Sequence, residues 1–191
     1  MNKNICVFAG SNTGTNPNFK TQATKLGSAI AKRGYGLVYG GASVGLMGAV
    51  ADGALAAGGS VVGVIPKSIA DLEIAHPHLS ELIVVETMHQ RKASMIELSE
   101  HFVVLPGGIG SLEETFEVMT WSQLGIHRKA IGLLNVDGFY DLLETFLDQL
   151  VQEGFVKESQ RHILLAETDP DTLLTQLECT EVVEEKKWID S

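Results

Sequence analysis

Short apolar runs alternate along most of the chain with longer segments of helical periodicity. The apolar runs predict strands at residues 5–9, 36–39, 61–65, 82–85, 102–105, 130–134 and 163–165. Segments in which apolar residues recur every three or four positions predict helices at 19–33, 46–57, 91–99, 111–124 and 140–153, with a shorter helix from Pro170 onward. Gly34 and Gly58-Gly59 stand where two of these helices should end.

The predicted strands are apolar without a clear alternation, which is typical of strands covered on both faces. Strands that alternate with helices favour an α/β fold with a doubly wound parallel sheet, here of about seven strands flanked by helices. The length of 191 residues fits one domain over 1–191, with 181–191 as a solvated tail. Ligands of such sheets bind at the carboxyl ends of the strands, so the candidate loops are 10–18, 40–46, 66–80 and 106–112.

Two glycine-rich turns connect a predicted strand to a predicted helix. One reads Gly-Gly-Ala-Ser-Val-Gly-Leu-Met-Gly at 40–48, and the other Pro-Gly-Gly-Ile-Gly-Ser-Leu-Glu-Glu at 106–114. Glycines let the backbone approach a ligand, and each turn opens a helix whose free N–H groups and dipole favour an anion. The Ser111 hydroxyl is suited either to cap the helix or to bind a phosphate oxygen.

A single turn of this kind is an ordinary βα connection about as often as it is a ligand site, and neither turn matches a P-loop or a dinucleotide fingerprint. Together with the polar turn at 10–14, however, they place three candidate loops on one sheet edge, which favours a phosphorylated small molecule. The predicted contacts from these loops are Ser11, Gly41, Ser43, Gly107, Gly108, Ile109, Gly110, Ser111 and Leu112.

Charged residues flank the second glycine turn. Glu113 follows the turn directly, where an acid beside an anion site indicates chemistry, whereas Glu114 points about 100° away around the helix and is interpreted as structural. Arg91 precedes the strand at 102–105 and offers a fork of donors to a phosphate, carboxylate or sugar hydroxyl, although a surface arginine is the simpler alternative.

The formal net charge is −10, from 24 acidic and 14 basic residues. This balance argues against binding to nucleic acid but permits a local site for a small anion. No zinc-type spacing is present, His76 and His78 lack a third ligand, and Cys6 in an apolar run is expected to be a small buried hydrophobe. Neither a signal peptide nor a membrane span is expected, which predicts a cytoplasmic location.

The two glycine turns, together with Met-His-Gln-Arg-Lys at 88–92, resemble the signature of the LONELY GUY (LOG) family of cytokinin riboside 5′-monophosphate phosphoribohydrolases. The resemblance extends from about residue 5 to 155 and implies a Rossmann-like fold, a homodimer or larger homo-oligomer, and hydrolysis of a nucleoside monophosphate without metal or cofactor. It implies that Arg91 and Glu113 are catalytic, with substrate contacts at the 107–112 loop and at Glu73, Lys92 and Thr120. Ser111 replaces the usual threonine, and Ala42 the third of three glycines.

The implied reaction builds positive charge on the ribose, as glycoside hydrolysis does. Glu113 is then expected to stabilise this charge, orient a water or attack directly, and these roles stay open. A non-catalytic carrier of nucleotide or molybdenum cofactor would keep the phosphate loops without needing Arg91 and Glu113. Lysine decarboxylation is disfavoured because Lys67 and Lys92 lie in no recognisable pyridoxal phosphate motif. The preferred base, prenylated adenine or plain adenine, is also left open.

Overall fold

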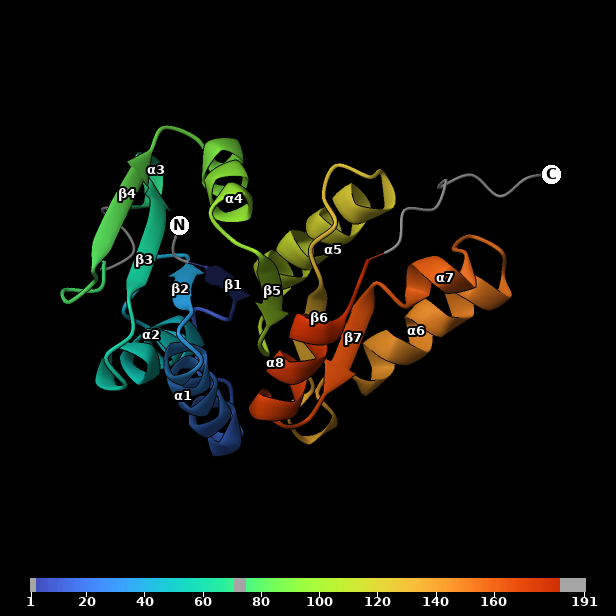
Figure 1. Cartoon of the computed structure of the whole chain (residues 1–191), viewed down its shortest axis with the longest axis horizontal. Coiled ribbons are helices and arrows are strands. Elements are labelled where there is room, and N and C mark those ends of the chain that lie inside the picture. The colour runs from blue at the N-terminus through green and yellow to red at the C-terminus, as the bar shows by residue number, and fades with distance from the viewer. Residues whose placement is uncertain (1–2, 71–74, 183–191) are drawn as a thin grey trace.

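The doubly wound α/β fold predicted from the sequence is confirmed. The computed structural model describes residues 3–70 and 75–182. One sheet of seven parallel strands has the order β4-β3-β2-β1-β5-β6-β7 (Figure 1). The strands are β1 Asn4–Phe8, β2 Gly36–Tyr39, β3 Val61–Pro66, β4 Glu81–Val85, β5 His101–Val104, β6 Ile131–Leu134 and β7 Leu164–Glu167.

The helices begin at signals that the sequence carries. The longer ones are α1 Pro17–Lys32, α2 Gly45–Ala56, α4 Met88–Glu97, α5 Ile109–Gln123, α6 Asp141–Gln152 and α8 Pro170–Cys179. A capping box between Thr87 and Gln90 starts α4 three residues before the predicted position. The four-residue helices α3 Lys67–Ala70 and α7 Glu158–Arg161, and the 3₁₀ turn η1 Val136–Gly138, were not predicted because they are too short to show a period.

Two apolar layers cover the two faces of the sheet. Along β1, Ile5 and Val7 pack into the layer of α1, α2 and α8, whereas Cys6 and Phe8 pack into the layer of α4, α5 and α6. Figure 1 shows α1 and α2 side by side on one face, with α4 and α5 on the other. Cys6 is the small buried hydrophobe expected, and its burial raises the pKa of the thiol.

The chain reverses its winding direction at β1. This strand pairs with β2 on one side and with β5 on the other, and the register aligns Phe8 with Val104 at their carboxyl ends. The connection after β1 leads to α1 on one face, and the connection after β5 leads to α5 on the opposite face. The loops therefore diverge between these two strands and open the crevice in which such sheets bind ligands.

Candidate active site

The loops that follow β1 and β5 touch one another at the crevice. The N–H of Gly10 donates to the Pro106 carbonyl over 3.1 Å. A Cβ at Gly10 would lie 3.2 Å from the Gly107 Cα, so glycine permits this close approach. The polar turn after β1 and the second glycine turn therefore form one continuous surface.

The N-terminus of α5 is open toward this surface. Gly108 caps the helix without a side-chain hydrogen bond, and the first backbone bond of the turn runs from Leu112 N to the Gly108 carbonyl over 3.1 Å. The N–H groups of residues 109–111 precede that bond and lack an intrahelical acceptor. A Cβ at Gly108 or Gly110 would meet no atom within 4 Å. Free donors, the helix dipole and open space together make this end suited to an anion.

The first glycine turn uses two of its backbone donors within the protein. The N–H groups of Leu46 and Met47, at the start of α2, both donate to the Gly10 carbonyl, over 3.0 and 3.3 Å. Gly45 has φ of 63°, and a Cβ there would lie 2.3 Å from the carbonyl carbon of Ser11. The donors that would have bound a phosphate are therefore used to hold the β1 loop, and this turn packs loops together.

Two predicted contacts of that first turn also lie in packed surroundings. Gly41 is buried with φ of 85°, faces Leu82 and Gly63, and accepts a hydrogen bond from the His76 N–H over 3.0 Å. Ser43 is half-buried, and its carbonyl faces Gly48 in the first turn of α2. Ser11, by contrast, lies at the crevice itself.

A cavity of ≈ 260 Å³, here called the glycine-loop cavity, lies between β1, α4 and α5. Apolar atoms of Met47 and Met95 contribute to its wall. Its polar lining comes from Ser11, Gly108, Gly110, Ser111, Arg91 and Glu114. The structure thus brings together the open helix end, one cation and one carboxyl group.

Arg91 enters the cavity from the first turns of α4. Only 7% of the residue is exposed. One terminal nitrogen, Nη2, donates to the Gly40 carbonyl over a long 3.5 Å, Nη1 lies 3.6 Å from the sulfur of Met88, and Nε is buried without a partner. A Cβ at Gly40 would lie 2.2 Å from Nη2, which explains the glycine at this position. A buried guanidinium with unused donors is suited to bind an anionic or hydroxyl-rich ligand.

The carboxyl group in the cavity belongs to Glu114. Burial raises the pKa of this carboxyl to about 7, although the positive charge of Arg91 opposes the shift. Such a group exchanges a proton near neutral pH, which is the property required of a general acid or base.

Glu113 points elsewhere. Its side chain is 55% exposed, and its Oε1 accepts a hydrogen bond from the Nζ of Lys92 over 2.7 Å. Consecutive helical residues point about 100° apart, so only one of the two glutamates can face the cavity. Of the two glutamates, Glu114 therefore lines the glycine-loop cavity.

Sequence reasoning missed Glu114, yet a signal was present. The buried face of α5 includes Ser111, Thr115 and Val118. Glu114 lies three residues after the first and four before the last of these, which is the spacing of one helix face.

The Lys92 side chain is paired with two glutamates of α5. Its side chain is 9% exposed, and its Nζ lies 2.7 Å from Glu113 Oε1 and 3.0 Å from Glu117 Oε1. Burial lowers the pKa of this ammonium, but the hydrogen bonds that it donates to both glutamates outweigh that effect and raise the pKa from its ordinary value. In this structure Lys92, which was predicted to contact the substrate, forms an ion cluster that joins α4 to α5.

The remaining predicted contacts are dispersed. Thr120 is exposed on α5, and its hydroxyl donates to the Phe116 carbonyl over 2.7 Å. Leu112 packs against the apolar layer of α4 to α6, and Ile109 is 87% exposed at the cavity rim. Glu73 lies outside the described residues.

Within residues 3–70 and 75–182, no three His, Cys, Asp or Glu side chains are grouped so as to hold a metal ion. Among the helices described there, none has the length and apolar composition that crossing a bilayer requires.

An anion-binding helix end, a buried arginine and a carboxyl of raised pKa at the switch point of a parallel sheet define an α/β enzyme that acts on a small phosphorylated molecule.

Comparison with known proteins makes the assignment specific. The model of a family described as possible lysine decarboxylase matches residues 47–177. Two Arabidopsis thaliana relatives are named cytokinin riboside 5′-monophosphate phosphoribohydrolases LOG5 and LOG2. The first is 46% identical, with 97% of this chain and 84% of the relative covered, and the second is 49% identical, with 92% and 83% covered. The chain belongs to the LOG family of cytokinin riboside 5′-monophosphate phosphoribohydrolases.

Solved structures share the fold at much lower identity. The molybdenum cofactor carrier protein of Chlamydomonas reinhardtii superposes with a TM-score of 0.71 at 22% identity, covering 94% of this chain and 100% of that one. The molybdenum cofactor binding protein of Rippkaea orientalis gives 0.69 at 23% identity, covering 94% and 98%. These likenesses concern the architecture alone.

Proposed function

We propose that this protein hydrolyses the N-glycosidic bond of cytokinin riboside 5′-monophosphates, releasing the free base and ribose 5-phosphate. One observation carries the proposal: Arg91 and Glu114 line the same cavity as the open N-terminus of α5. The names of the relatives support it, because both describe this reaction on this class of substrate.

In the proposed reaction, the N–H groups at the start of α5 and the Ser111 hydroxyl bind the 5′-phosphate. Holding the phosphate uses remote binding energy to position the ribose in the cavity. As the bond to the base breaks, positive charge develops on the ribose, and the ionised Glu114 carboxylate stabilises it. Glu114 then accepts a proton from the attacking water, whose oxygen bonds to the anomeric carbon; the base leaves with the electrons of the broken bond and takes up that proton from Glu114. Arg91 binds the substrate's anionic or hydroxyl groups through its unused donors.

The proposal assigns to Glu114 the catalytic role that the family resemblance alone placed at Glu113. A matched pair of variants tests this choice. With an N6-prenylated adenosine monophosphate as substrate, Glu114→Gln should reduce base release by about 100-fold or more, the usual loss for a general base. Glu113→Gln, one residue away and exposed, should stay within about threefold of the parent, since surface changes have small effects.

Chromatography of the released base and of ribose 5-phosphate measures both variants. A large loss in Glu113→Gln with normal turnover in Glu114→Gln would reverse the assignment. Tight binding of monophosphates without base release by the parent protein would instead favour a non-catalytic carrier. A panel of prenylated and plain adenine, guanine and cytosine monophosphates would identify the preferred base.

A homodimer or larger assembly in the cytoplasm is also part of the proposal. Exposed apolar side chains on α4 and α5 support it: Ile109 is 87% exposed, Met88 43% and Phe116 38%. Large exposed apolar surface, where it is contiguous, marks association sites. Light scattering of the purified protein should give at least twice the chain mass of 20.6 kDa, and Phe116→Glu should reduce it.

A further inference from the structure

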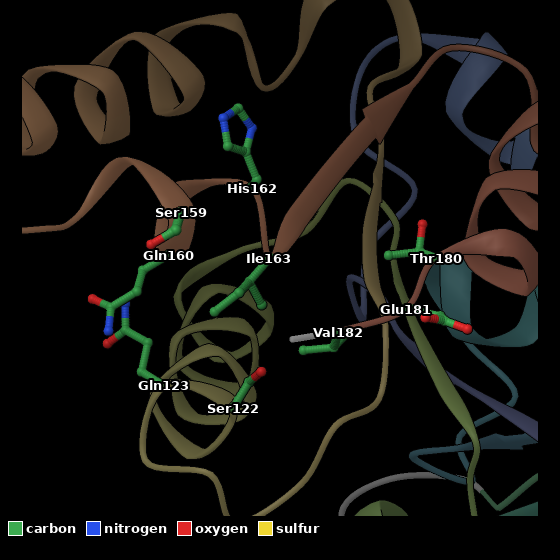
Figure 2. Close-up of a pocket in the computed structure, with 9 residues that line it drawn as sticks. All are labelled: Ser122, Gln123, Ser159, Gln160, His162, Ile163, Thr180, Glu181 and Val182. Atoms are coloured by element: carbon green, nitrogen blue, oxygen red, sulfur yellow. The ribbon is translucent and has the colours of Figure 1, made fainter. Parts of the chain in front are cut away.

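A second cavity lies at the opposite edge of the sheet from the glycine loops. Its volume is ≈ 360 Å³, and its lining includes Ser122 and Gln123 of α5, Gln160 of α7, Ile163 before β7, and Glu181 and Val182 after α8 (Figure 2). We call it the far cavity. α5 has 15 residues and so runs about 21 Å from its start at the glycine-loop cavity to its end here. The two cavities are therefore separate.

Two buried side chains in the far cavity each carry a polar atom without a hydrogen-bond partner. Ser122 is 8% exposed and Gln160 is 6% exposed. The Ser122 Oγ and the Gln160 Nε2 are both buried without a partner. Buried polar groups in folded proteins are almost always paired, and leaving one unpaired costs about 1–3 kcal/mol. In the glycine-loop cavity, the Nε of Arg91 is likewise buried without a partner.

The chemistry of the lining restricts what can bind. The Gln160 Nε2 is a donor only, so it requires an acceptor such as a carbonyl oxygen or a ring nitrogen. The Ser122 hydroxyl can donate or accept, and Figure 2 shows the Gln123 side chain pointing toward that of Gln160. Ile163 and Val182 add apolar wall. Among the described residues that line this cavity there is one histidine, His162, but no lysine or arginine, while Glu181 adds a carboxylate, which disfavours an anion.

We propose that the far cavity binds a small neutral molecule that has an amide-like edge and an apolar body. Its carbonyl oxygen accepts from Gln160 and its N–H donates to Ser122, while the apolar body packs on Ile163 and Val182. The cavity volume lies within the usual range for small-molecule sites, about 300–1,000 Å³. This site is independent of the proposed hydrolysis, because none of these side chains lines the glycine-loop cavity.

Benzamide and benzoate test the proposal as a matched pair of probes. They have nearly the same shape, but benzamide is neutral and benzoate is an anion at neutral pH. Titration of the full chain, followed by protein NMR or calorimetry, should show one saturable benzamide site and at least about tenfold weaker binding of benzoate. Equal binding of the two probes, or no saturable binding of benzamide, would overturn the proposal.

Variants locate the binding. Gln160→Met keeps the length of the side chain but removes the amide, and Ser122→Ala removes the hydroxyl. Each should weaken benzamide binding about fivefold, the value of one neutral hydrogen bond. Gln152→Met, an exposed glutamine on α6, is the control and should leave binding unchanged. If Gln160→Met fails to fold, Ser122→Ala decides alone. Unchanged affinity in the folded variants would place the probe elsewhere and refute the assignment.

Discussion

Replacing Lys92 by methionine removes the cation that joins α4 to α5 while keeping a long apolar side chain. In the parent, the Nζ lies 2.7 Å from Glu113 Oε1 and 3.0 Å from Glu117 Oε1. The two carboxylates would respond differently to its loss. Glu113 is 55% exposed and can be hydrated, whereas Glu117 is 21% exposed and its Oε2 is already buried without a partner. The cost therefore falls mainly on Glu117.

Removing one partner of a buried ion pair costs about 3–5 kcal/mol. Because Glu117 retains some contact with water, we expect Lys92→Met to lower the free energy of unfolding by about 3 kcal/mol, at the low end of that range. The double variant Lys92→Met/Glu117→Met replaces the pair by apolar side chains and should recover most of the loss, to within about 1 kcal/mol of the parent. Urea denaturation followed by circular dichroism measures all three proteins.

The same variant separates two roles for Lys92. If Lys92 acts by joining the two helices, its loss should reduce both stability and kcat, because α4 carries Arg91 and α5 carries Glu114. If Lys92 instead contacts the substrate directly, its loss should raise KM and leave stability near that of the parent. A loss of stability below about 1 kcal/mol, or no recovery in the double variant, would refute the reasoning from burial.

Four further predictions concern Glu114 and the two glycine turns. Since burial raises the pKa of Glu114 to about 7 and the reaction needs its ionised form, kcat/KM should increase as the pH rises through 7, and a rate profile from pH 5 to 9 should show this rise. The free energy of unfolding should show the opposite dependence on pH. The native state binds this proton more tightly than the unfolded state does, so the free energy of unfolding should fall as the pH rises from about 4.5 to 7. Urea denaturation should show this trend in the parent protein but not in Glu114→Gln. Gly108→Ala places a methyl group in open space at the anion site, so steady-state kinetics should show KM raised by about tenfold with stability unchanged. Gly45→Ala meets positive φ and the Ser11 backbone at 2.3 Å, so it should lower the unfolding free energy by about 2 kcal/mol or more, again measured in urea.

The fold could be predicted because its signals are local and repeated. Buried parallel strands are continuous apolar runs, and helices between them show a 3.6-residue period, so the alternation and the sheet follow from the pattern. The residues at which the helices begin were predicted less accurately. The start of α4 depends on a reciprocal capping box between Thr87 and Gln90, a short polar signal that the period of the apolar residues does not contain.

The site could be predicted only in part, because two of its features depend on tertiary packing. The turns at 40–48 and 106–112 look alike as sequences. Only the structure shows that the Gly10 carbonyl occupies the first N–H groups of α2 and leaves those of α5 free. The choice between Glu113 and Glu114 depends on the rotation of α5 about its axis, which its weakly amphipathic sequence specifies less clearly than its length.

The arrangement also explains how a chain with a net charge of −10 can bind an anion. The positive potential is local: it comes from backbone N–H groups at the start of α5 and from Arg91, which is 7% exposed. Lys92, the other cation nearby, is neutralised by the glutamates on α5 and adds little free charge to the cavity. Because buried charges and fixed dipoles are screened far less than surface lysines, the site needs no basic surface to hold a phosphate. The acidic exterior and an anionic substrate are therefore compatible.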